Sequence, residues 1–114
     1  MTDALLGAAA LGDIGELFPD TDPANRGRDS AEMLAAAVAR LAAAGYRVVN
    51  LDCIVFAERP KLSPYKEEIQ KRLATLLSIG ADRVGVKAKT GEGLGPVGLQ
   101  EAIAAECVVL IEPC

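Results

Sequence analysis

The sequence predicts a single α+β domain, built as a two-layer sandwich in which helices cover one face of a mixed β-sheet. Its 114 residues suit one domain, and a hydrophobic fraction of 51% is enough for a core. The predicted elements run in the order helix, helix, strand, helix, strand, strand, which is typical of such a sandwich. No apolar run reaches the roughly 18 residues of a transmembrane helix.

Two helices are predicted before the first strand. Residues Asp3–Leu11 are apolar almost all round and predict a buried helix, capped by Thr2 or Asp3 and stopped near Gly12. Residues 12–29 are rich in Gly, Asp and Pro and predict a long loop. An amphipathic helix over Ser30–Ala44 follows. Its predicted boundaries are a capping box, formed by Asp29 and Glu32, and a terminal glycine, Gly45.

Three strands and one more helix are predicted in the second half. The strands are Tyr46–Glu58, with Asn50 and Asp52 on one face, then Arg83–Lys89 and Glu101–Glu112. The last segment fits helix or strand by its pattern, and its apolar ending Val108–Ile111 favours a strand. Between the first two strands, the helix is expected to have Ser63 as its cap, Pro64 at its first position and Gly80 just past its end.

Charge and residue types exclude several functions. The net charge is −4, with no basic block, so the chain is a poor candidate for binding a nucleic-acid backbone. Aromatic residues make up only 4%, which argues against base stacking. There is no histidine, so no imidazole serves as a base or ligand within these residues. The three cysteines form no C-x-x-C pair and are expected to be reduced thiols. They are Cys53, Cys107 and Cys114.

A glycine-rich stretch after the Arg83–Lys89 strand could bind phosphate. Its glycines fit G-x-G-x-x-G, but Pro96 lies inside the motif and we reject a dinucleotide fold. Lys87 and Lys89 leave the same face of a strand, and the Thr90 hydroxyl and free glycine amides would complete a phosphate cradle. Glu92 beside it would suit Mg²⁺ held together with phosphate oxygens. The alternative is an ordinary turn with two solvated lysines.

Two loops are further candidates for ligand contacts. Residues 12–22 contain Asp13, Asp20 and Asp22, which either cap backbone amides or accept hydrogen bonds from a diol. Residues 57–63 run from a strand into a helix, a junction that commonly holds ligands. The alternative for this second loop is a tight connector with no ligand.

Four segments together resemble the 2-C-methyl-D-erythritol 2,4-cyclodiphosphate synthases of the non-mevalonate isoprenoid pathway. They are TDALLGAAALGDIGELFPDTD (Thr2–Asp22), DSAE (Asp29–Glu32), AERPKL (Ala57–Leu62) and VKAKTGEGLG (Val86–Gly95). In order, they cover essentially the whole chain, and the first is long and specific. The chain is therefore identified as a member of this family.

The resemblance implies a phosphorus–oxygen lyase, which closes a cyclic diphosphate in a CDP-linked methylerythritol 2-phosphate and expels CMP. It implies a homotrimer with active sites between neighbouring subunits, located in the cytoplasm, or in a plastid if the source is eukaryotic. It also implies Zn²⁺ and a second cation, Mg²⁺ or Mn²⁺, which neutralise the diphosphate so that one phosphate oxygen can attack the other phosphorus. No nucleic-acid or membrane partner is expected.

Carried over by position, the resemblance assigns three groups of substrate-binding residues. The first group comprises Asp13, Ile14 and Gly15, which match the family's contacts to substrate, and a flexible loop over the methylerythritol part, Phe18, Pro19, Asp20, Thr21 and Asp22. Those of the CMP pocket are Ala57, Glu58, Arg59, Pro60, Lys61, Leu62 and Ser63, with Lys61 contacting phosphate or ribose. Those at the diphosphate are Lys89, Thr90, Gly91 and Glu92, with Thr90 catalytic and Glu92 a ligand of the second cation.

The chain departs from the family pattern in two places. The family's zinc ligands, an aspartate and two histidines, have no counterpart here, so we expect one domain (residues 1–114) that lacks its N-terminal strands and holds no zinc ligand. Pro96 and Leu99 replace the Phe and Arg at the mouth of the trimer's central cavity. This replacement weakens the case for regulatory binding of an isoprenoid diphosphate there.

Three hypotheses follow from these observations. The first is a synthase whose zinc-bearing strands lie outside residues 1–114, with these residues inactive alone. The second is a zinc-free pseudoenzyme that binds CMP or substrate. The third is a non-functional fragment that associates through exposed strand edges. Release of CMP and calorimetry with CMP separate the three.

Overall fold

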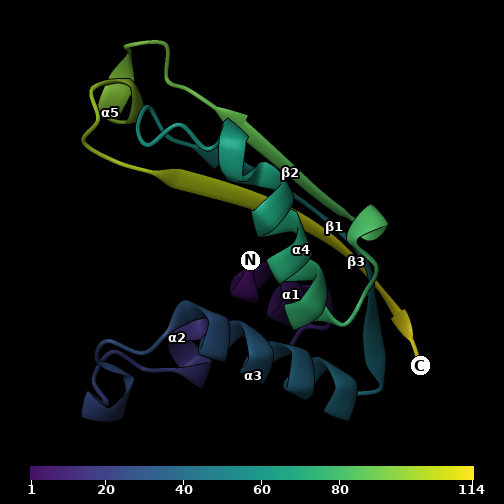
Figure 1. Cartoon of the computed structure of the whole chain (residues 1–114). Coiled ribbons are helices and arrows are strands. Elements are labelled where there is room, and N and C mark those ends of the chain that lie inside the picture. The colour runs from purple at the N-terminus through teal and green to yellow at the C-terminus, as the bar shows by residue number, and fades with distance from the viewer.

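A mixed three-stranded sheet forms one layer of the computed structural model, which describes residues 1–114 (Figure 1). The central strand β1 (Tyr46–Phe56) pairs in parallel with β2 (Val84–Lys89) and antiparallel with β3 (Ala104–Pro113). The predicted mixed sheet is confirmed, and so is the choice of strand for the C-terminal segment. The predicted first strand ran two residues too far, because pairing in β1 ends at Phe56.

A β-bulge in β1 decides which residues reach the core. The register of β1 against β3 shifts between Val48 and Asn50, so Val49 is the extra residue. Val48 and Leu51 are three positions apart, yet both are buried, which strict alternation would not allow. Asn50 and Asp52 lie on the opposite, exposed face, as predicted.

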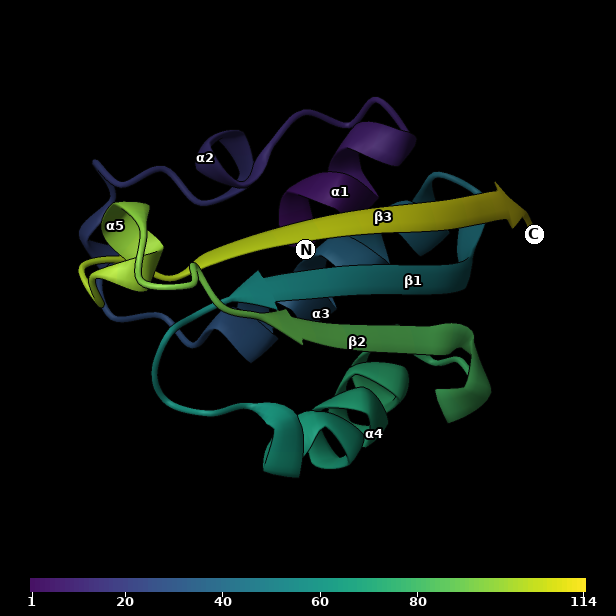
Figure 2. The same ribbon diagram turned by 90° about the horizontal axis from the view of Figure 1, so that it is seen from above.

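Three helices cover one face of the sheet, which confirms the two-layer prediction (Figure 2). Helix α1 (Thr2–Ala8) packs on β3, α3 (Ser30–Ala43) on β1, and α4 (Lys66–Leu77) on β2. The apolar core between the layers consists of Leu5, Leu6, Leu34, Ala37, Leu41, Val48, Leu51, Cys53, Leu73, Ala74, Leu77 and Val84. The other face of the sheet, which we call the open face, carries no helix and leaves Val108 and Leu110 exposed.

Helix α1 differs from its prediction at both ends. It ends at Ala8 rather than near Gly12, because Ala10 adopts a left-handed conformation (φ 55°) and the Leu11 amide donates back to the Leu6 carbonyl at 2.8 Å. No side chain caps its start. The Asp3 carboxylate instead accepts a hydrogen bond from the Ile14 amide at 2.7 Å and so ties the following loop to α1.

Helix α3 follows its predicted boundaries with one change. The Asp29 carboxylate accepts from the Ala31 amide at 2.9 Å, and Gly45 lies past the helix end with φ 89°. Glu32 does not complete the capping box, because its side chain forms an ion pair with Arg28 at 2.8 Å. The four-residue spacing of this pair places both side chains on one side of the helix start.

The other connections contain short helical turns. The predicted loop 12–29 includes α2 (Ile14–Leu17) and a 3₁₀ turn (Pro23–Asn25). Ser63 caps no helix: Ser63–Tyr65 is a 3₁₀ turn that precedes α4. Helix α4 ends at Leu77, and the residue that terminates it is the left-handed Ser78 (φ 57°) rather than a glycine. The last turns are a 3₁₀ turn at Ala81–Arg83 and the four-residue α5 (Gly95–Gly98).

No helix of this fold has both the length and the hydropathy to cross a membrane.

All three cysteines are free thiols, as predicted, and two of them are neighbours on adjacent strands. Cys53 in β1 lies opposite Cys107 in β3, and its side chain is buried in the core. Burial, together with the neighbouring Cys107 and Asp52, raises the pKa of the Cys53 thiol from an ordinary value of 9.0 to about 11.

This shift predicts a loss of stability at alkaline pH. In the unfolded chain Cys53 ionises near pH 9, whereas in the folded chain it stays neutral until about pH 11. The unfolded state therefore binds fewer protons over this window, and the free energy of unfolding falls as the pH rises, by roughly 2–3 kcal/mol in total. Urea titrations of the wild type and Cys53→Ala between pH 8.5 and 11 measure the effect. The difference in the free energy of unfolding between wild type and Cys53→Ala should shrink by this amount as the pH rises. A difference that does not change with pH contradicts the prediction.

Candidate functional site

The loops that follow β1 and β2 enclose one cavity. Phe56 and Lys89 are register partners at the ends of these parallel strands, so both loops leave the same edge of the sheet. The Ala57 amide donates to the Lys89 carbonyl at 3.0 Å and extends this pairing by one bond. The cavity has a volume of about 460 Å³ and is lined by Ala57, Glu58, Lys61, Leu62, Ser63, Pro64, Ala88, Lys89 and Thr90. Two of the three predicted site segments therefore meet in space.

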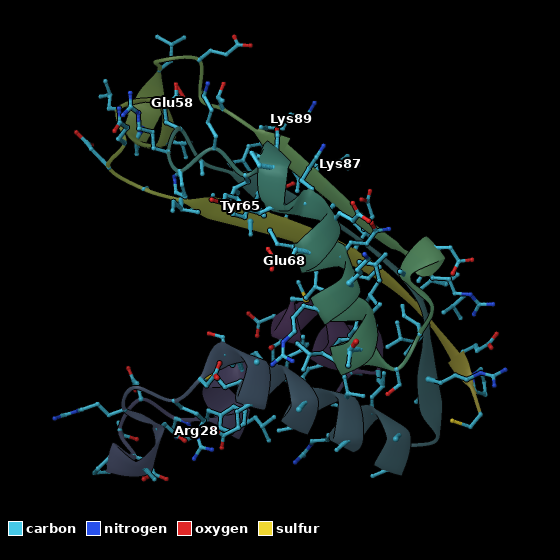
Figure 3. All side chains as sticks on the ribbon, in the orientation of Figure 1. Arg28, Glu58, Tyr65, Glu68, Lys87 and Lys89 are labelled. Carbon is cyan, nitrogen blue, oxygen red and sulfur yellow. The ribbon has the colours of Figure 1, made fainter.

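The charge at this cavity is positive. Lys61 and Lys89 are exposed at its walls, and neither forms an ion pair. Both lysines of the predicted phosphate cradle lie on β2 (Figure 3). Only Lys89 lines the cavity, because the Lys87 ammonium forms an ion pair with Asp52 at 2.7 Å on the open face.

The glycine-rich loop beyond Thr90 is held by a carboxylate. The two oxygens of Glu58 accept hydrogen bonds from the Gly91 amide at 3.1 Å and the Gly93 amide at 3.2 Å. The Leu94 amide donates to the Gly91 carbonyl at 2.9 Å and closes a turn around Glu92 and Gly93, both with positive φ. Thr90 adds a contact, since its hydroxyl oxygen accepts from the Glu92 amide at 3.3 Å.

Two glycines let this loop close on itself. A Cβ placed at Gly91 would lie 2.4 Å from the Gly98 nitrogen, and one at Gly98 would lie 2.5 Å from the Gly93 carbonyl carbon. Larger residues would force these backbone segments apart. The glycines thus serve close packing of the loop. The rejection of a dinucleotide fold agrees with this geometry, because α5 spans only Gly95–Gly98 and leads into β3 rather than a long helix.

The donor groups of this site suit a hard divalent cation and not zinc. Glu92 is exposed beside Thr90, and Mg²⁺ commonly takes one carboxylate together with phosphate oxygens. No group of three Cys, Asp or Glu side chains gathers anywhere in the chain in a way that could hold a metal ion, and the chain has no histidine. The usual four-coordinate zinc site therefore cannot be built from these residues.

In the third predicted segment (residues 12–22, which we call the aspartate segment), two of the aspartates accept hydrogen bonds from nearby backbone amides. Asp13 accepts from the Glu16 amide at 2.8 Å and caps α2, and Asp22 accepts from the Ala24 amide at 3.0 Å. Each of these bonds uses one carboxylate oxygen, which leaves the other facing solvent. Of the other predicted residues of the segment, Ile14 and Phe18 are half-buried, and Gly15, Pro19, Asp20 and Thr21 are exposed.

Arg28 organises this segment, and the sequence analysis missed it. Its guanidinium lies 5.0 Å from the centre of the Phe18 ring, as in a cation–π contact. The same group donates to Asn25 at 3.1 Å and pairs with Glu32, while the Asn25 amide donates to the Pro19 carbonyl at 2.8 Å. The spacing of Arg28 and Glu32 was the one local signal that could have indicated this role.

The aspartate segment does not reach the cavity within one copy of the chain. No residue of 12–22 lines the cavity. Figure 1 separates α2 and the neighbouring loop from α5 and the glycine-rich loop, although Figure 2 shows both toward the end of the sheet at which β1 and β2 finish. Figure 3 shows the same separation for the labelled Arg28 and Glu58. The predicted site is therefore divided into two parts: a lysine-lined cavity at the ends of β1 and β2, and a carboxylate-rich segment beside α2.

Comparison with known proteins identifies relatives along the whole chain. A family model described as the YgbB family matches residues 1–112. A 2-C-methyl-D-erythritol 2,4-cyclodiphosphate synthase of Gemmatimonas aurantiaca is 56% identical over 103 residues, which are 90% of this chain and 62% of that protein. The chain thus spans less than two thirds of that relative's length.

Two solved structures have the same fold. The bifunctional IspDF of Campylobacter jejuni superposes with a TM-score of 0.94 and 41% identity, covering 99% of this chain and 31% of that one. A 2C-methyl-D-erythritol-2,4-cyclodiphosphate synthase in its CDP-bound form superposes with a TM-score of 0.87 and 40% identity, covering 97% of this chain and 71% of that one.

The role of Arg28 predicts a local effect of its removal. In Arg28→Ala, the cation–π contact and the hydrogen bond to Asn25 are lost together, so segment 18–25 should open more readily, by roughly 1–2 kcal/mol. Amide hydrogen exchange in that segment should accelerate by about 5–30-fold. Arg26→Ala is the matched control, because Arg26 is exposed and makes no such contacts. Equal exchange in the two variants would show that Arg28 does not order the loop.

Proposed function

The chain belongs to the YgbB family, and from this membership we propose that it acts in the cyclodiphosphate synthase reaction of isoprenoid biosynthesis. In this reaction a CDP-linked methylerythritol 2-phosphate yields methylerythritol 2,4-cyclodiphosphate and CMP, which makes the enzyme a lyase. The observation that carries the proposal is the cavity where Lys61, Lys89 and Thr90 meet. Two unpaired ammonium groups and a hydroxyl are suited to a diphosphate. We place the reaction in the cytoplasm, or in a plastid for a eukaryotic source.

The CMP end of the substrate is assigned to the loop over residues 57–63. This loop forms one wall of the cavity, and the CDP-bound relative supports a nucleoside diphosphate as its ligand. Lys61 is proposed to contact the phosphate or ribose. Arg59 and Pro60 are exposed in the same loop, where they can contact the base.

Thr90 and Glu92 are assigned to the reacting diphosphate. The Thr90 oxygen accepts from the Glu92 amide, so its own proton is free to be donated to a phosphate oxygen. This donation would stabilise the charge that develops at phosphorus, which makes Thr90 the proposed catalytic residue. Glu92 would hold Mg²⁺ or Mn²⁺, and such a cation neutralises diphosphate charge when bound. Lys89 adds a fixed positive charge on the same edge.

Zinc is proposed to depend on ligands outside residues 1–114. The family resemblance implies Zn²⁺, but no residues of this chain gather to hold it. We accordingly propose that these residues form a domain without its zinc-bearing strands, and that they do not turn over substrate alone. A zinc-free protein that binds CMP or substrate is the second candidate function, supported by the cavity, because its lysines and Thr90 can contact phosphate without zinc.

The divided site supports a homotrimer as the functional unit. No residue of the aspartate segment lines the cavity of its own copy, and we propose that a neighbouring copy brings its aspartate segment to this cavity. The open face of the sheet offers a surface for this contact: Val108 and Leu110 are 75% and 56% exposed there. Apolar side chains on a strand face with no covering layer are typical of a subunit interface.

Calorimetric titration with CDP tests the binding part of the proposal. The wild-type chain should bind CDP, and Lys61→Ala should weaken binding by roughly tenfold or more, because it removes a charge-assisted hydrogen bond. Lys71→Ala is the matched control, since Lys71 is exposed on α4 away from the cavity. The assignment of Lys61 to the CMP pocket is contradicted if the wild type does not bind CDP, or if Lys61→Ala and Lys71→Ala bind it with equal affinity.

Phosphorus NMR of the CDP-linked substrate with Zn²⁺ and Mg²⁺ then separates the two candidate functions. Binding without CMP release is the result expected for residues 1–114. If the same residues joined to zinc-bearing strands of a relative release CMP, the chain is a synthase domain. If the joined protein binds the substrate but still releases no CMP, the second candidate function, a zinc-free binding protein, is correct. Steady CMP release from residues 1–114 alone contradicts the argument about zinc.

Light scattering coupled to size exclusion tests the trimer. The wild-type chain should elute with the mass of three copies, and Val108→Glu should shift it to one copy, because the substitution places three carboxylates in an apolar contact. Lys71→Glu on the exposed surface of α4 is the control. A Val108→Glu protein that remains trimeric excludes the open face as the interface, and a monomeric wild type excludes the trimer.

A further inference from the structure

Glu58 stands out because both its carboxylate oxygens face inward, onto the backbone of another loop. The residue lies in the segment assigned to the CMP pocket, yet its oxygens accept from the Gly91 and Gly93 amides, 33 and 35 positions away. Its side chain is half-buried and forms no ion pair. These hydrogen bonds join the loop after β1 to the loop after β2.

The two amides bonded to Glu58 flank a residue with an unfavourable backbone conformation. Glu92, between Gly91 and Gly93, has φ 52°, in the left-handed region that residues with a side chain rarely adopt. Gly93 follows with φ 75°, and the Leu94 amide closes the turn onto the Gly91 carbonyl. A single carboxylate that binds the amides before and after Glu92 offsets the cost of this conformation, because hydrogen bonds to a charged acceptor are strong.

The turn also fixes Thr90. Its hydroxyl oxygen accepts from the Glu92 amide, so the orientation of the hydroxyl depends on the conformation of Glu92. Glu92 is exposed, and no hydrogen bond occupies its carboxylate. The Glu58 carboxylate thus holds a turn that carries both the Thr90 hydroxyl, which lines the cavity, and the exposed Glu92 carboxylate, two residues further along the chain.

We propose that Glu58 is a positioning residue, which holds the Gly91–Leu94 turn so that Glu92 is preorganised for a divalent cation and Thr90 for a phosphate oxygen. The proposal rests on the proposed function for the identity of the ligands. The hydrogen bonds of Glu58 to the turn do not rest on it. Glu58 acts through Thr90 and Glu92 and touches neither the cation nor the phosphate.

The first experiment measures the clamp itself, on the full chain without ligand. Amide exchange at Gly91 and Gly93, followed by NMR, should accelerate roughly tenfold in Glu58→Ala relative to the wild type. Glu58→Gln keeps one acceptor oxygen, so it should release one amide and give a smaller effect. Glu68→Ala is the charge-matched control, because Glu68 is an exposed residue of α4 (Figure 3). Unchanged exchange in Glu58→Ala overturns the proposal.

The second experiment measures Mn²⁺ binding in the presence of saturating CDP, by water-proton relaxation. Glu58→Ala should weaken Mn²⁺ roughly tenfold, Glu58→Gln should restore part of the affinity, and Glu92→Ala should abolish binding. Loss of Mn²⁺ in Glu58→Ala as complete as in Glu92→Ala, with normal amide exchange, would make Glu58 a metal ligand and overturn the proposal. A wild type that binds neither CDP nor Mn²⁺ refutes the proposed function, and the exchange result still decides the clamp.

Discussion

The parallel pairing of β1 with β2 is the constraint on which the candidate site depends. Because the two strands run the same way and end as partners at Phe56 and Lys89, their outgoing loops must share one edge of the sheet. Antiparallel pairing would place these loops at opposite edges. The buried register of Leu51 against Val84 fixes the alignment, since a slip of one residue would turn apolar side chains to solvent. Core packing and site geometry therefore have the same origin.

The two parts of the site are ordered by different means. The glycine-rich loop is held by backbone amides on a carboxylate and by close packing of Gly91 against Gly98. The aspartate segment depends on side chains, with Arg28 joining Phe18 and Asn25. The glycine-rich loop is thus ordered mainly through its own backbone, and the aspartate segment through contacts between half-buried side chains.

Local sequence patterns were enough to predict the two layers of the fold. They were not enough to predict contacts between residues far apart in the sequence. Alternation and helical periodicity indicated the strands and the buried faces, and Asp29 was predicted as a cap because its partner is two residues away. The early end of α1 at Ala8 was missed, because Ala10 takes a conformation for which glycine is the usual signal. Lys87 could not be matched to Asp52 from the sequence, since 35 positions separate them and only the strand register brings them together. Glu58 was placed in the correct loop, but its partners depend on the same register.

The ion pair of Lys87 with Asp52 would give the proposed subunit contact on the open face a preferred alignment. Each side chain is about half exposed in one copy, so water and dissolved salt weaken their attraction. A neighbouring copy packed against Val108 and Leu110 would strip that water away, and an unmatched charge in the contact would then be costly. Apolar surfaces alone tolerate sliding. Two opposite charges among the apolar side chains would prevent such sliding. A second copy packed on this face would then be held in a single orientation.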